Sequence, residues 1–417
     1  MLQTFRKDLK LLTRYRQLFP LCFAVFVSML GFGLVMPLLP IYARDFGATG
    51  GQLGFLTASF ALARAITTFP GGWLADKAGR KTPVIAGLLI YSIVMTLYGF
   101  SQEVHQLILL RALQGTASGI VWPVISTMVA DLTAPQDRGK ALGLYEMTWF
   151  LGMVIGPGFG GILAGSLTLA VPFFVCGALA FASMLLVMFT VKETIKIETI
   201  QVRPENKLKP NHSFSFWKDS ANNILSRITP YPHVFLGLCI VGFTISFSHS
   251  MIQPVLSVFA NEELHINVTD VGILFTMMGI VTLLTTLPLG TVADRTGRRN
   301  TLTFGIILLA LSAVLIPLSG SFWPLLLVIM VRGVGRAAAN PSLLAMFSNV
   351  ALASGRGKSM GIFNGFRNVG LVAGSTLGGF LYDAASSQSP FITCAIASLV
   401  GVSIVLLTVS ESRVGVE

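Results

Sequence analysis

Ionisable side chains lie inside runs of sequence that are otherwise apolar enough to cross a membrane. Glu146 is the carboxylate clearly inside such a run, and five arginines join it: Arg64, Arg111, Arg332, Arg336 and Arg367. A charge at the centre of a bilayer costs roughly 2.5–3.5 kcal/mol on insertion scales, so such side chains normally face a cavity or a partner. We therefore expect a polar, positively charged cavity between membrane helices.

Neutral polar residues follow the same helical faces as these charges. They form three stripes at helical spacing: Arg332, Arg336 and Asn340; Asn364, Arg367 and Asn368; and Ser246, His249, Ser250 and Gln253. Hydrogen bonding between helices explains any one stripe equally well. Together they indicate a hydrated path, and the residues that we expect along it are Arg64, Gln114, Gln253, Arg332, Arg336, Asn340, Asn364 and Arg367.

The sign of this charge bears on the substrate. Guanidinium groups bind carboxylate and phosphate through paired hydrogen bonds. A positive cavity attracts an anionic or zwitterionic amphiphile more readily than a cation. One hypothesis is therefore a carrier of acidic drugs, organic anions or lipid headgroups.

Two side chains in these runs could carry a proton, Glu146 and His249. A glutamate whose arginine neighbour moves between two states can load and release a proton. Alternatively, Glu146 lies near the inner boundary of the membrane and pairs permanently with a base there. His249 could equally be a hydrogen-bonded interior histidine.

Twelve apolar runs would position these residues. The chain has 417 residues, 53% hydrophobic and 11% charged, with a mean hydropathy of +0.75, outside the range of soluble globular proteins. Runs of about 20 residues, enough to cross about 30 Å of hydrocarbon, fall at 19–42, 52–75, 82–101, 104–130, 139–166, 169–191, 233–260, 268–293, 300–319, 322–350, 357–383 and 388–410. This pattern predicts an all-α integral membrane protein with twelve transmembrane helices.

Basic residues between the runs predict the topology. They precede the first run and occupy alternate loops, whereas Arg44 is the one basic residue of the opposite loops. The positive-inside rule then places both termini in the cytoplasm, with the chain in the inner membrane of the cell. The expected parts are a cytoplasmic segment 1–18, a six-helix bundle 19–191, a cytoplasmic loop 192–232 with an interfacial helix at 212–228, a second bundle 233–410 and a cytoplasmic tail 411–417.

The two bundles are copies of each other. GGWLADKAGRK at 71–81 matches LGTVADRTGRR at 289–299, and the segment 138–163 matches 356–381. The offset is 218 residues in both pairs, 290 − 72 and 374 − 156. An internal repeat of six spans is typical of carriers that rock two bundles about a site at the membrane midplane.

The repeated loop resembles a signature of the major facilitator superfamily, and the resemblance covers essentially the whole chain. It implies two pseudo-symmetric six-helix bundles and a conformational latch that braces the outward-open state. The latch residues are Gly72, Asp76, Lys77, Gly79, Arg80, Asp294, Arg295, Gly297 and Arg298. Alternatively, these charges only set the topology. Arg111 with Gln114 resembles the signature whose arginine the family associates with proton coupling, and the alternative is a structural hydrogen bond between helices.

Gly152-x-x-x-Gly156-Pro157-x-x-Gly160-Gly161 resembles the antiporter signature of the twelve-helix drug/proton antiporter group. Glycines four residues apart form a groove for another helix, and Pro157 bends the helix. The second copy has Ser375 in place of the proline. The first run, with Leu30-Gly31, Pro37 and Pro40, also resembles this group. It lacks the acid that several members exporting cations carry.

These features favour a secondary active transporter that works by alternating access, as a proton-coupled antiporter exporting small amphipathic compounds or drugs. The alternatives are an organic anion or lipid transporter or facilitator with an arginine-rich cavity and, more remotely, a channel or a transport-inactive sensor. The sequence shows no phosphate-binding loop, metal cluster or nucleophile constellation, so we expect no enzyme activity, cofactor or metal. The expected partners are a small-molecule substrate, protons and the lipid bilayer, with no nucleic acid and the chain acting as a monomer.

Overall fold

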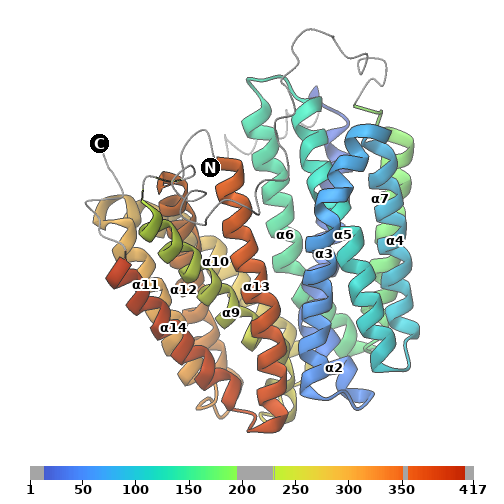
Figure 1. Cartoon of the computed structure of the whole chain (residues 1–417). Helices are drawn as coiled ribbons and strands as arrows, with labels where there is room; N and C mark the ends of the chain where they lie inside the picture. The colour runs from blue at the N-terminus through green and yellow to red at the C-terminus, as the bar shows by residue number, and fades with distance from the viewer. Residues whose placement is uncertain (1–13, 195–228, 230, 351–355, 409–417) are drawn as a thin grey trace, which may run out of the picture.

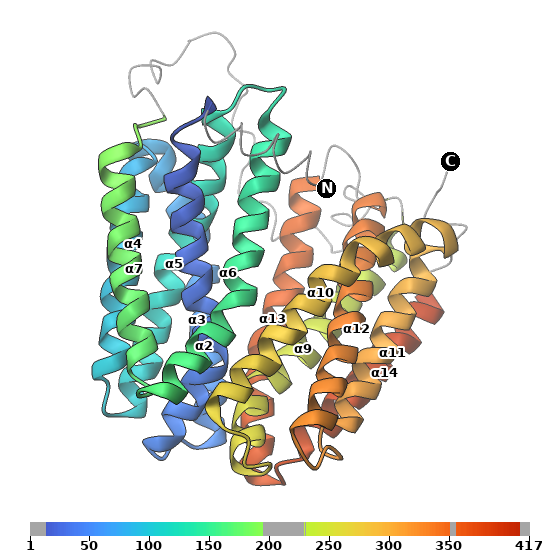
Figure 2. The same cartoon turned by 180° about the vertical axis from the view of Figure 1, so that it is seen from behind.

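The computed structural model describes residues 14–194, 229, 231–350 and 356–408, and this part of the chain folds as twelve α-helices (Figures 1 and 2). The first six are α2 (Leu18–Asp45), α3 (Gly50–Ala78), α4 (Lys81–Phe100), α5 (Val104–Leu132), α6 (Arg138–Ser166) and α7 (Val171–Thr190). The second six are α9 (Pro232–Glu262), α10 (Val268–Thr296), α11 (Arg298–Leu315), α12 (Phe322–Val350), α13 (Arg356–Ala384) and α14 (Ser389–Thr408). The predicted all-α fold class is confirmed.

The interfacial helix predicted at 212–228 and most of the predicted cytoplasmic loop 192–232 lie outside the described residues. The same holds for residues 1–13 and for the predicted tail 411–417.

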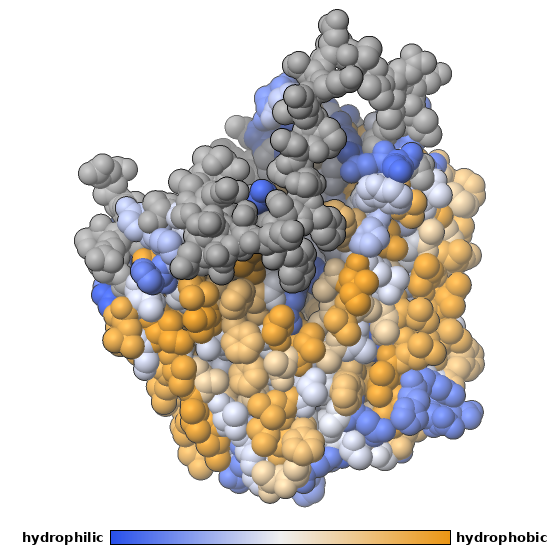
Figure 3. Space-filling view, viewed as in Figure 1, coloured by the Kyte–Doolittle hydropathy of each residue, from blue (hydrophilic) through white to orange (hydrophobic). Residues whose placement is uncertain are grey.

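Each set of six helices forms one half of the molecule. Helices α2–α7 lie together on one side in both ribbon views, and α9–α14 lie together on the other (Figures 1 and 2). The outer surface of the halves is apolar: Phe189 is 77% exposed and Leu407 is 85% exposed, and hydrophobic residues cover much of the visible flank in Figure 3. Apolar side chains on the outside suit contact with lipid, and the helices satisfy their own backbone hydrogen bonds, as the interior of a bilayer requires.

Eleven of the described helices are long and apolar enough to cross a membrane, and α13 is the exception. Its central turns carry Asn364, Arg367 and Asn368. Helix α13 packs against α9 in its own half and against α3 in the other half. Its polar residues therefore lie in a helix with protein neighbours on two sides, at the interface of the halves.

Two glycines end α3 and α10 at equivalent positions of the repeat. Gly79 has a φ angle of +90° and Gly297 has a φ angle of +97°. Residues with a Cβ atom rarely adopt this backbone conformation. Each glycine permits a tight reversal into the next helix. We name this side of the molecule the repeat-loop end, and the opposite side, with loop residues 46–49, 263–267 and 385–388, the far end.

The two halves approach most closely near the far end. Helix α3 crosses α13 where Gly50 faces Gly379, and α6 crosses α10 where Gly161 faces Gly272. A Cβ on Gly272 would lie 2.9 Å from the Cα of Gly161, closer than two carbon atoms pack. Small residues let helix backbones meet in this way.

The hydrophobic core shows the same asymmetry between the two ends. Near the far end, one cluster of buried residues runs through both halves and includes Leu38 and Phe259. Toward the repeat-loop end each half has its own cluster, around Ile125 in the first and Phe347 in the second. The halves are therefore joined at the far end and separate toward the repeat-loop end, as the ribbons in Figure 1 also show.

Candidate functional site

A cavity of about 620 Å³ lies between the halves. Its main walls are residues 57–69 of α3 and 361–371 of α13, so it begins where the crossing of these helices ends and extends toward the repeat-loop end. Three of the predicted substrate residues line it: Arg64, Gln253 and Asn364. Because both halves form its walls, a bound molecule would contact both.

The wall from the first half combines aromatic rings with two guanidinium groups. The Arg64 guanidinium lies over the Trp122 ring, 4.5 Å from its centroid, and that of Arg111 lies over Phe60 at 4.6 Å. The rings also meet one another, with 5.2 Å between the centroids of Phe32 and Phe60. A cation held against an aromatic face gains up to about 2 kcal/mol where water is excluded. The stacking therefore offsets part of the cost of these charges.

A buried hydrogen-bond network holds Arg111. Its Nη1 donates to Gln114 Oε1 at 2.7 Å, and the Tyr98 hydroxyl donates to the same oxygen at 3.1 Å. Gln114 Nε2 donates to the Tyr91 hydroxyl at 3.4 Å, which donates to the Ser28 carbonyl at 2.7 Å. Gln114 is fully buried. Gln114 therefore lies behind Arg111 and supports its guanidinium. Our prediction that Gln114 lines the cavity is wrong.

The wall from the second half is polar and uncharged. Gln253 of α9 and Asn364 and Asn368 of α13 supply amide groups, and no Asp or Glu is among the cavity-lining residues. The formal charge of the described lining therefore comes from Arg64 and Arg111.

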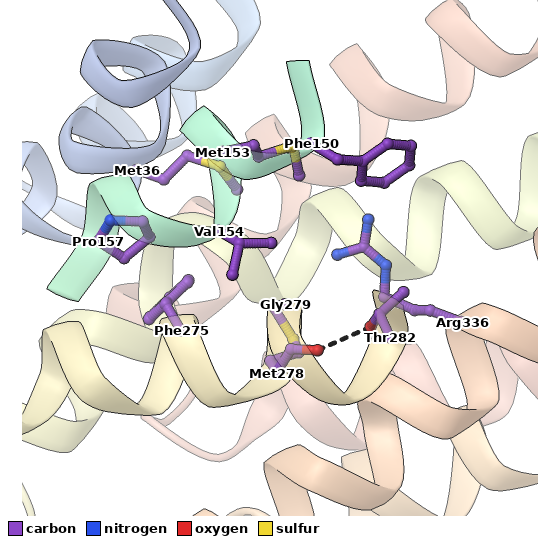
Figure 4. Close-up of a pocket in the computed structure, with 10 residues that line it drawn as sticks. All are labelled: Met36, Phe150, Met153, Val154, Pro157, Phe275, Met278, Gly279, Thr282 and Arg336. Atoms are coloured by element: carbon purple, nitrogen blue, oxygen red, sulfur yellow. Dashed lines mark hydrogen bonds between the residues drawn. The ribbon is translucent and has the colours of Figure 1, made fainter. Parts of the chain in front are cut away.

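A smaller pocket of about 60 Å³ lies between α6 of the first half and α10 and α12 of the second (Figure 4). Its lining is mainly apolar, with Phe150, Met153 and Pro157 on one side and Phe275 and Met278 on the other. The predicted substrate residue Arg336 also lines it and points toward Phe150 in Figure 4. Arg336 is the one charged residue among the described residues that line this pocket.

Three further predicted substrate residues line neither space. Arg332 is only 2% exposed, and its guanidinium lies 3.3 Å from Ser312 Oγ and 3.4 Å from the Leu309 carbonyl oxygen. Arg367 donates from Nε to Ser246 Oγ at 3.4 Å. Asn340 is absent from both linings. The structure thus places Arg332 and Arg367 in contact with helices of their own half, and fewer of the predicted arginines line the cavity than we expected.

The two proton-carrier candidates have different surroundings. Glu146 is exposed, and by helical periodicity it shares a face of α6 with Phe150 and Pro157, which line the smaller pocket. No ion pair or hydrogen bond to its carboxylate is found within the described residues. His249 is half-buried and lies within electrostatic reach of Arg332, Arg336 and Arg367.

Among the described residues, the predicted latch residues make their contacts within their own halves. Asp76 Oδ1 lies 3.9 Å from Arg80 Nη2, and Lys77 stacks on the Trp73 ring at 4.1 Å. Arg80 also pairs with Asp131 at the end of α5. In the second copy, Asp294 Oδ1 lies 3.3 Å from Arg298 Nη2. Within the part of the chain that the structure describes, Gly72 and Arg295 make no ion pair or hydrogen bond with the opposite half.

The main-chain N–H groups of Arg80 and Lys81 donate to the two carboxylate oxygens of Glu193 at 2.9 and 3.0 Å. Sequence reasoning missed both Asp131 and Glu193. An acid next to a basic loop is the available signal, but only the fold shows which acids reach that loop.

An ionic clasp joins the halves at the far end. Arg44 Nε lies 3.2 Å from Glu262 Oε1, and Arg44 Nη2 lies 3.2 Å from Asp383 Oδ1. The main-chain N–H of Gly50 also donates to Asp383. Arg44 comes from α2, and both acids come from the second half. The signal in the sequence was Arg44 itself, the only basic residue of the loops on that side.

The glycine groove of α6 receives α2. A Cβ on Gly152 would lie 2.7 Å from Met29 Cβ, and a Cβ on Gly160 would lie 2.7 Å from Leu34 Cγ. Gly156 faces the backbone of α2 at Leu30. Gly161, on another side of α6, makes the crossing with α10. Pro157 lies between these two contacts and lines the smaller pocket.

Two six-helix halves joined at one end, with a polar space between them that opens toward the other, define a membrane carrier. The family model of the Major Facilitator Superfamily matches residues 21–227 and 238–416. The chain belongs to this family. It is a multi-pass membrane transporter of small molecules and not an enzyme.

Characterised relatives and solved structures cover nearly the whole chain. Multidrug resistance protein 2 of Bacillus subtilis (strain 168) is 29% identical over 385 residues, which is 92% of each protein. The quinolone resistance protein NorA of Staphylococcus aureus (strain Mu50 / ATCC 700699) is 28% identical over 397 residues, covering 94% of this chain and 96% of that protein. The structure of a bacterial homolog of the human lysosomal transporter Spinster, inward-facing and occupied, superposes with a TM-score of 0.76 at 15% identity, over 96% of this chain and 97% of that one.

Proposed function

We propose that this protein exports small amphipathic, drug-like compounds across the membrane in exchange for protons. The observation that carries the proposal is full-length similarity to two proteins named for multidrug and quinolone resistance. The complete antiporter signature on α6 supports exchange, because its glycines give α2 and α10 close contacts on two sides of one helix.

The geometry supports alternating access. The halves are joined at the far end by the Arg44 clasp and by the glycine crossings, while both cavities lie on the repeat-loop side of these contacts. If the basic loops face the cytoplasm, as the positive-inside rule predicts, this conformation is open to the cytoplasm. Both chain termini then lie in the cytoplasm, with the protein in the inner membrane of the cell.

Export requires the opposite conformation as well. The far end must then separate, which breaks the pairs of Arg44 with Glu262 and Asp383. The repeat loops must also meet across the halves, where Asp76 and Asp294 act as the latch. One chain contains both halves, both loops and the whole cavity, which supports a functional monomer.

For proton coupling we propose Glu146 as the carrier, with Arg111 and His249 as further participants. Glu146 is exposed on the face of α6 that borders the open space, and no described base holds it in a permanent pair. His249 lies within electrostatic reach of Arg332, Arg336 and Arg367, so it belongs to the cluster of ionisable side chains in the second half.

The similarity to resistance proteins favours export over the alternatives. These relatives favour the export of drugs over facilitated transport of organic anions or lipids, and their names leave the charge of the exported drug open. A channel or a transport-inactive sensor does not require two glycine crossings and a clasp that hold one end of the halves together.

Flux in proteoliposomes under an imposed pH gradient tests the proposal. Wild-type protein should show saturable, gradient-driven transport of amphipathic compounds. Glu146→Gln should lose the dependence on the gradient while retaining exchange of substrate. Glu103→Gln is the matched control, because Glu103 is an exposed acid at the start of α5. Full gradient-driven transport by Glu146→Gln would refute the assignment of the carrier.

A further inference from the structure

The Arg64 guanidinium is a charge without a counter-charge at the middle of a membrane helix. Arg64 is the central residue of α3, which runs from Gly50 to Ala78. Within the described residues its side chain makes a cation–π contact with Trp122 but no ion pair and no hydrogen bond. An intramembrane charge normally finds a partner. Here the N–H donors of the guanidinium have no acceptor among the described residues, and Arg64 lines the cavity.

Arg111 does not compete with Arg64 for the same task. It is 3% exposed, and Gln114, Phe60 and Phe32 already contact its guanidinium. Arg64, in contrast, is exposed and lines the cavity, and among the described residues its guanidinium stacks on the Trp122 ring, with Tyr145 within electrostatic reach. Stacking on Trp122 orients the plane of the guanidinium and leaves its edge available. This edge binds a carboxylate or sulfonate through two parallel hydrogen bonds.

Aromatic rings adjoin this charge. Phe32, Phe60 and Phe69 line the cavity on the same wall as Arg64, and the Phe32 and Trp122 rings meet edge to face with 5.9 Å between their centroids. Each contact between two aromatic rings stabilises a complex by about 0.5–1.5 kcal/mol, in addition to the effect of burying apolar area. A planar aromatic body therefore fits beside Arg64, and the cavity of about 620 Å³ has room for a compound of two or three rings.

The opposite wall does not change the sign of the field. Gln253, Asn364 and Asn368 offer neutral amides, and the smaller pocket adds Arg336 and no acid. A cationic compound in the larger cavity would meet two guanidinium groups, those of Arg64 and Arg111, and no carboxylate among the described lining residues, since Glu146 lies on α6 outside this lining. Like charges brought together in a site shielded from water repel strongly, and such repulsion is a means of excluding wrong partners.

We infer that the compounds exported by this protein are aromatic acids, with the acidic group bound to Arg64 and the ring system against Phe32 and Phe60. This inference rests on the proposed function of export and specifies its substrate class. Arg64 is then the residue that determines specificity for charge, and Arg111 supports the positive potential from behind.

Two probes with the same ring system and fixed opposite charges test it: 1-naphthalenesulfonate and N-methylquinolinium. Fixed charges prevent passive leakage driven by the pH gradient. Wild-type protein in proteoliposomes should transport the sulfonate in preference to the quinolinium. Arg64→Gln should raise the KM for the sulfonate roughly 10- to 100-fold, the change expected on losing a hydrogen bond to a charged group.

Two further variants separate specificity from misfolding. Arg64→Glu should reverse the preference and transport N-methylquinolinium, a gain that an unfolded protein cannot show. Lys140→Gln removes one positive charge from the exposed start of α6, outside both cavities, and should leave the KM for the sulfonate unchanged.

The possible outcomes are distinct. If wild-type protein transports the quinolinium and not the sulfonate, or if Arg64→Gln keeps the wild-type KM for the sulfonate, the inference is wrong and the proposed export stands. If neither these probes nor neutral 1-naphthalenemethanol shows saturable transport under a pH gradient, the proposed function itself fails.

Discussion

Arg44 of the first half and Asp383 of the second form a salt bridge with 3.2 Å between Nη2 and Oδ1 at the far end of the molecule. The Asp383 carboxylate also accepts from the main-chain N–H of Gly50, and Arg44 also pairs with Glu262. These contacts exist only while the far end is closed. They therefore stabilise one of the two states that alternating access requires, the state with the far end closed.

Arg44→Gln should shift the protein toward the state that is open at the far end. Partly exposed ion pairs contribute about 0.2–1 kcal/mol each, so losing two of them should change the ratio of the states roughly 2- to 30-fold. Spin labels at Thr168→Cys and Ala385→Cys, exposed positions on the two halves at that end, report the change as a longer distance.

Arg14→Gln is the matched control for this experiment. Arg14 pairs with Asp137 at 3.1 Å, but both residues belong to the first half. Its loss should leave the distance between the spin labels unchanged. Equal distance distributions for Arg44→Gln and wild type would show that the clasp does not stabilise the closed far end.

Gly161→Val should prevent the halves from closing at the far end. A Cβ at residue 161 would lie 3.0 Å from Gly272 Cα and 3.0 Å from the Val268 carbonyl oxygen. Overpacking of this kind costs about 1–3 kcal/mol, and both neighbours are backbone atoms that cannot rotate away. We expect slower transport and the longer distance between the same spin labels.

Gly143→Val controls for the general effect of a β-branched residue in α6. A Cβ at Gly143 would have no neighbour within 4 Å, so this variant should transport normally. Equal transport rates for the two valine variants would argue against a role of the α6–α10 crossing in closure.

Gln114→Leu should destabilise the first half and weaken proton coupling. The leucine would leave Arg111 Nη1 and the Tyr98 hydroxyl without their shared acceptor. An unsatisfied buried group costs about 1–3 kcal/mol, more when it is charged. The expected result is a Tm several degrees lower in detergent and reduced transport driven by a pH gradient.

Gln106→Leu provides the comparison on the same helix. Gln106 Oε1 only accepts from the exposed main-chain N–H of Gln102 at 2.9 Å, which water can replace. This variant should keep the wild-type Tm. If Gln114→Leu retains both its Tm and its gradient-driven transport, the network around Arg111 has neither role.

Eleven of the twelve described helices could be predicted from the sequence because each depends on a local property, the length of an apolar run, and α13 is the copy of α6 in the internal repeat. The paired reversals at Gly79 and Gly297 were equally accessible, since the repeat is visible in the letters. What the sequence could not show is which arginine faces the cavity. Arg332 and Arg336 are four residues apart on one helix, yet Arg332 lies against atoms of α11 while Arg336 opens into a pocket.

The clasp was hidden for a related reason. Arg44 and Asp383 lie near the ends of helices 339 positions apart in sequence, and their meeting depends on how the two halves are docked. The aromatic wall of Phe32, Phe60 and Trp122 gave no signal either, since such residues are common in any membrane helix. Helical periodicity predicts the face of a helix, but the neighbours of that face come from the tertiary packing.

Asp76→Asn should act in the opposite direction to Arg44→Gln. In the present state the Asp76 side chain is 72% exposed and lies near Arg80 of its own loop, so its loss should not change the Tm of this state. If the loop braces the opposite state, the variant should favour closure at the far end, shorten the distance between the spin labels and slow turnover.

The double variant Arg44→Gln/Asp76→Asn should return the ratio of states toward that of wild type, because each change weakens one of two competing closures. Glu103→Gln, which removes an exposed acid at the far end, should move neither the distance nor the turnover. A longer distance for Asp76→Asn alone would mean that this residue stabilises the closed far end, and the proposed role of the repeat loop as a latch for the opposite state would then be wrong.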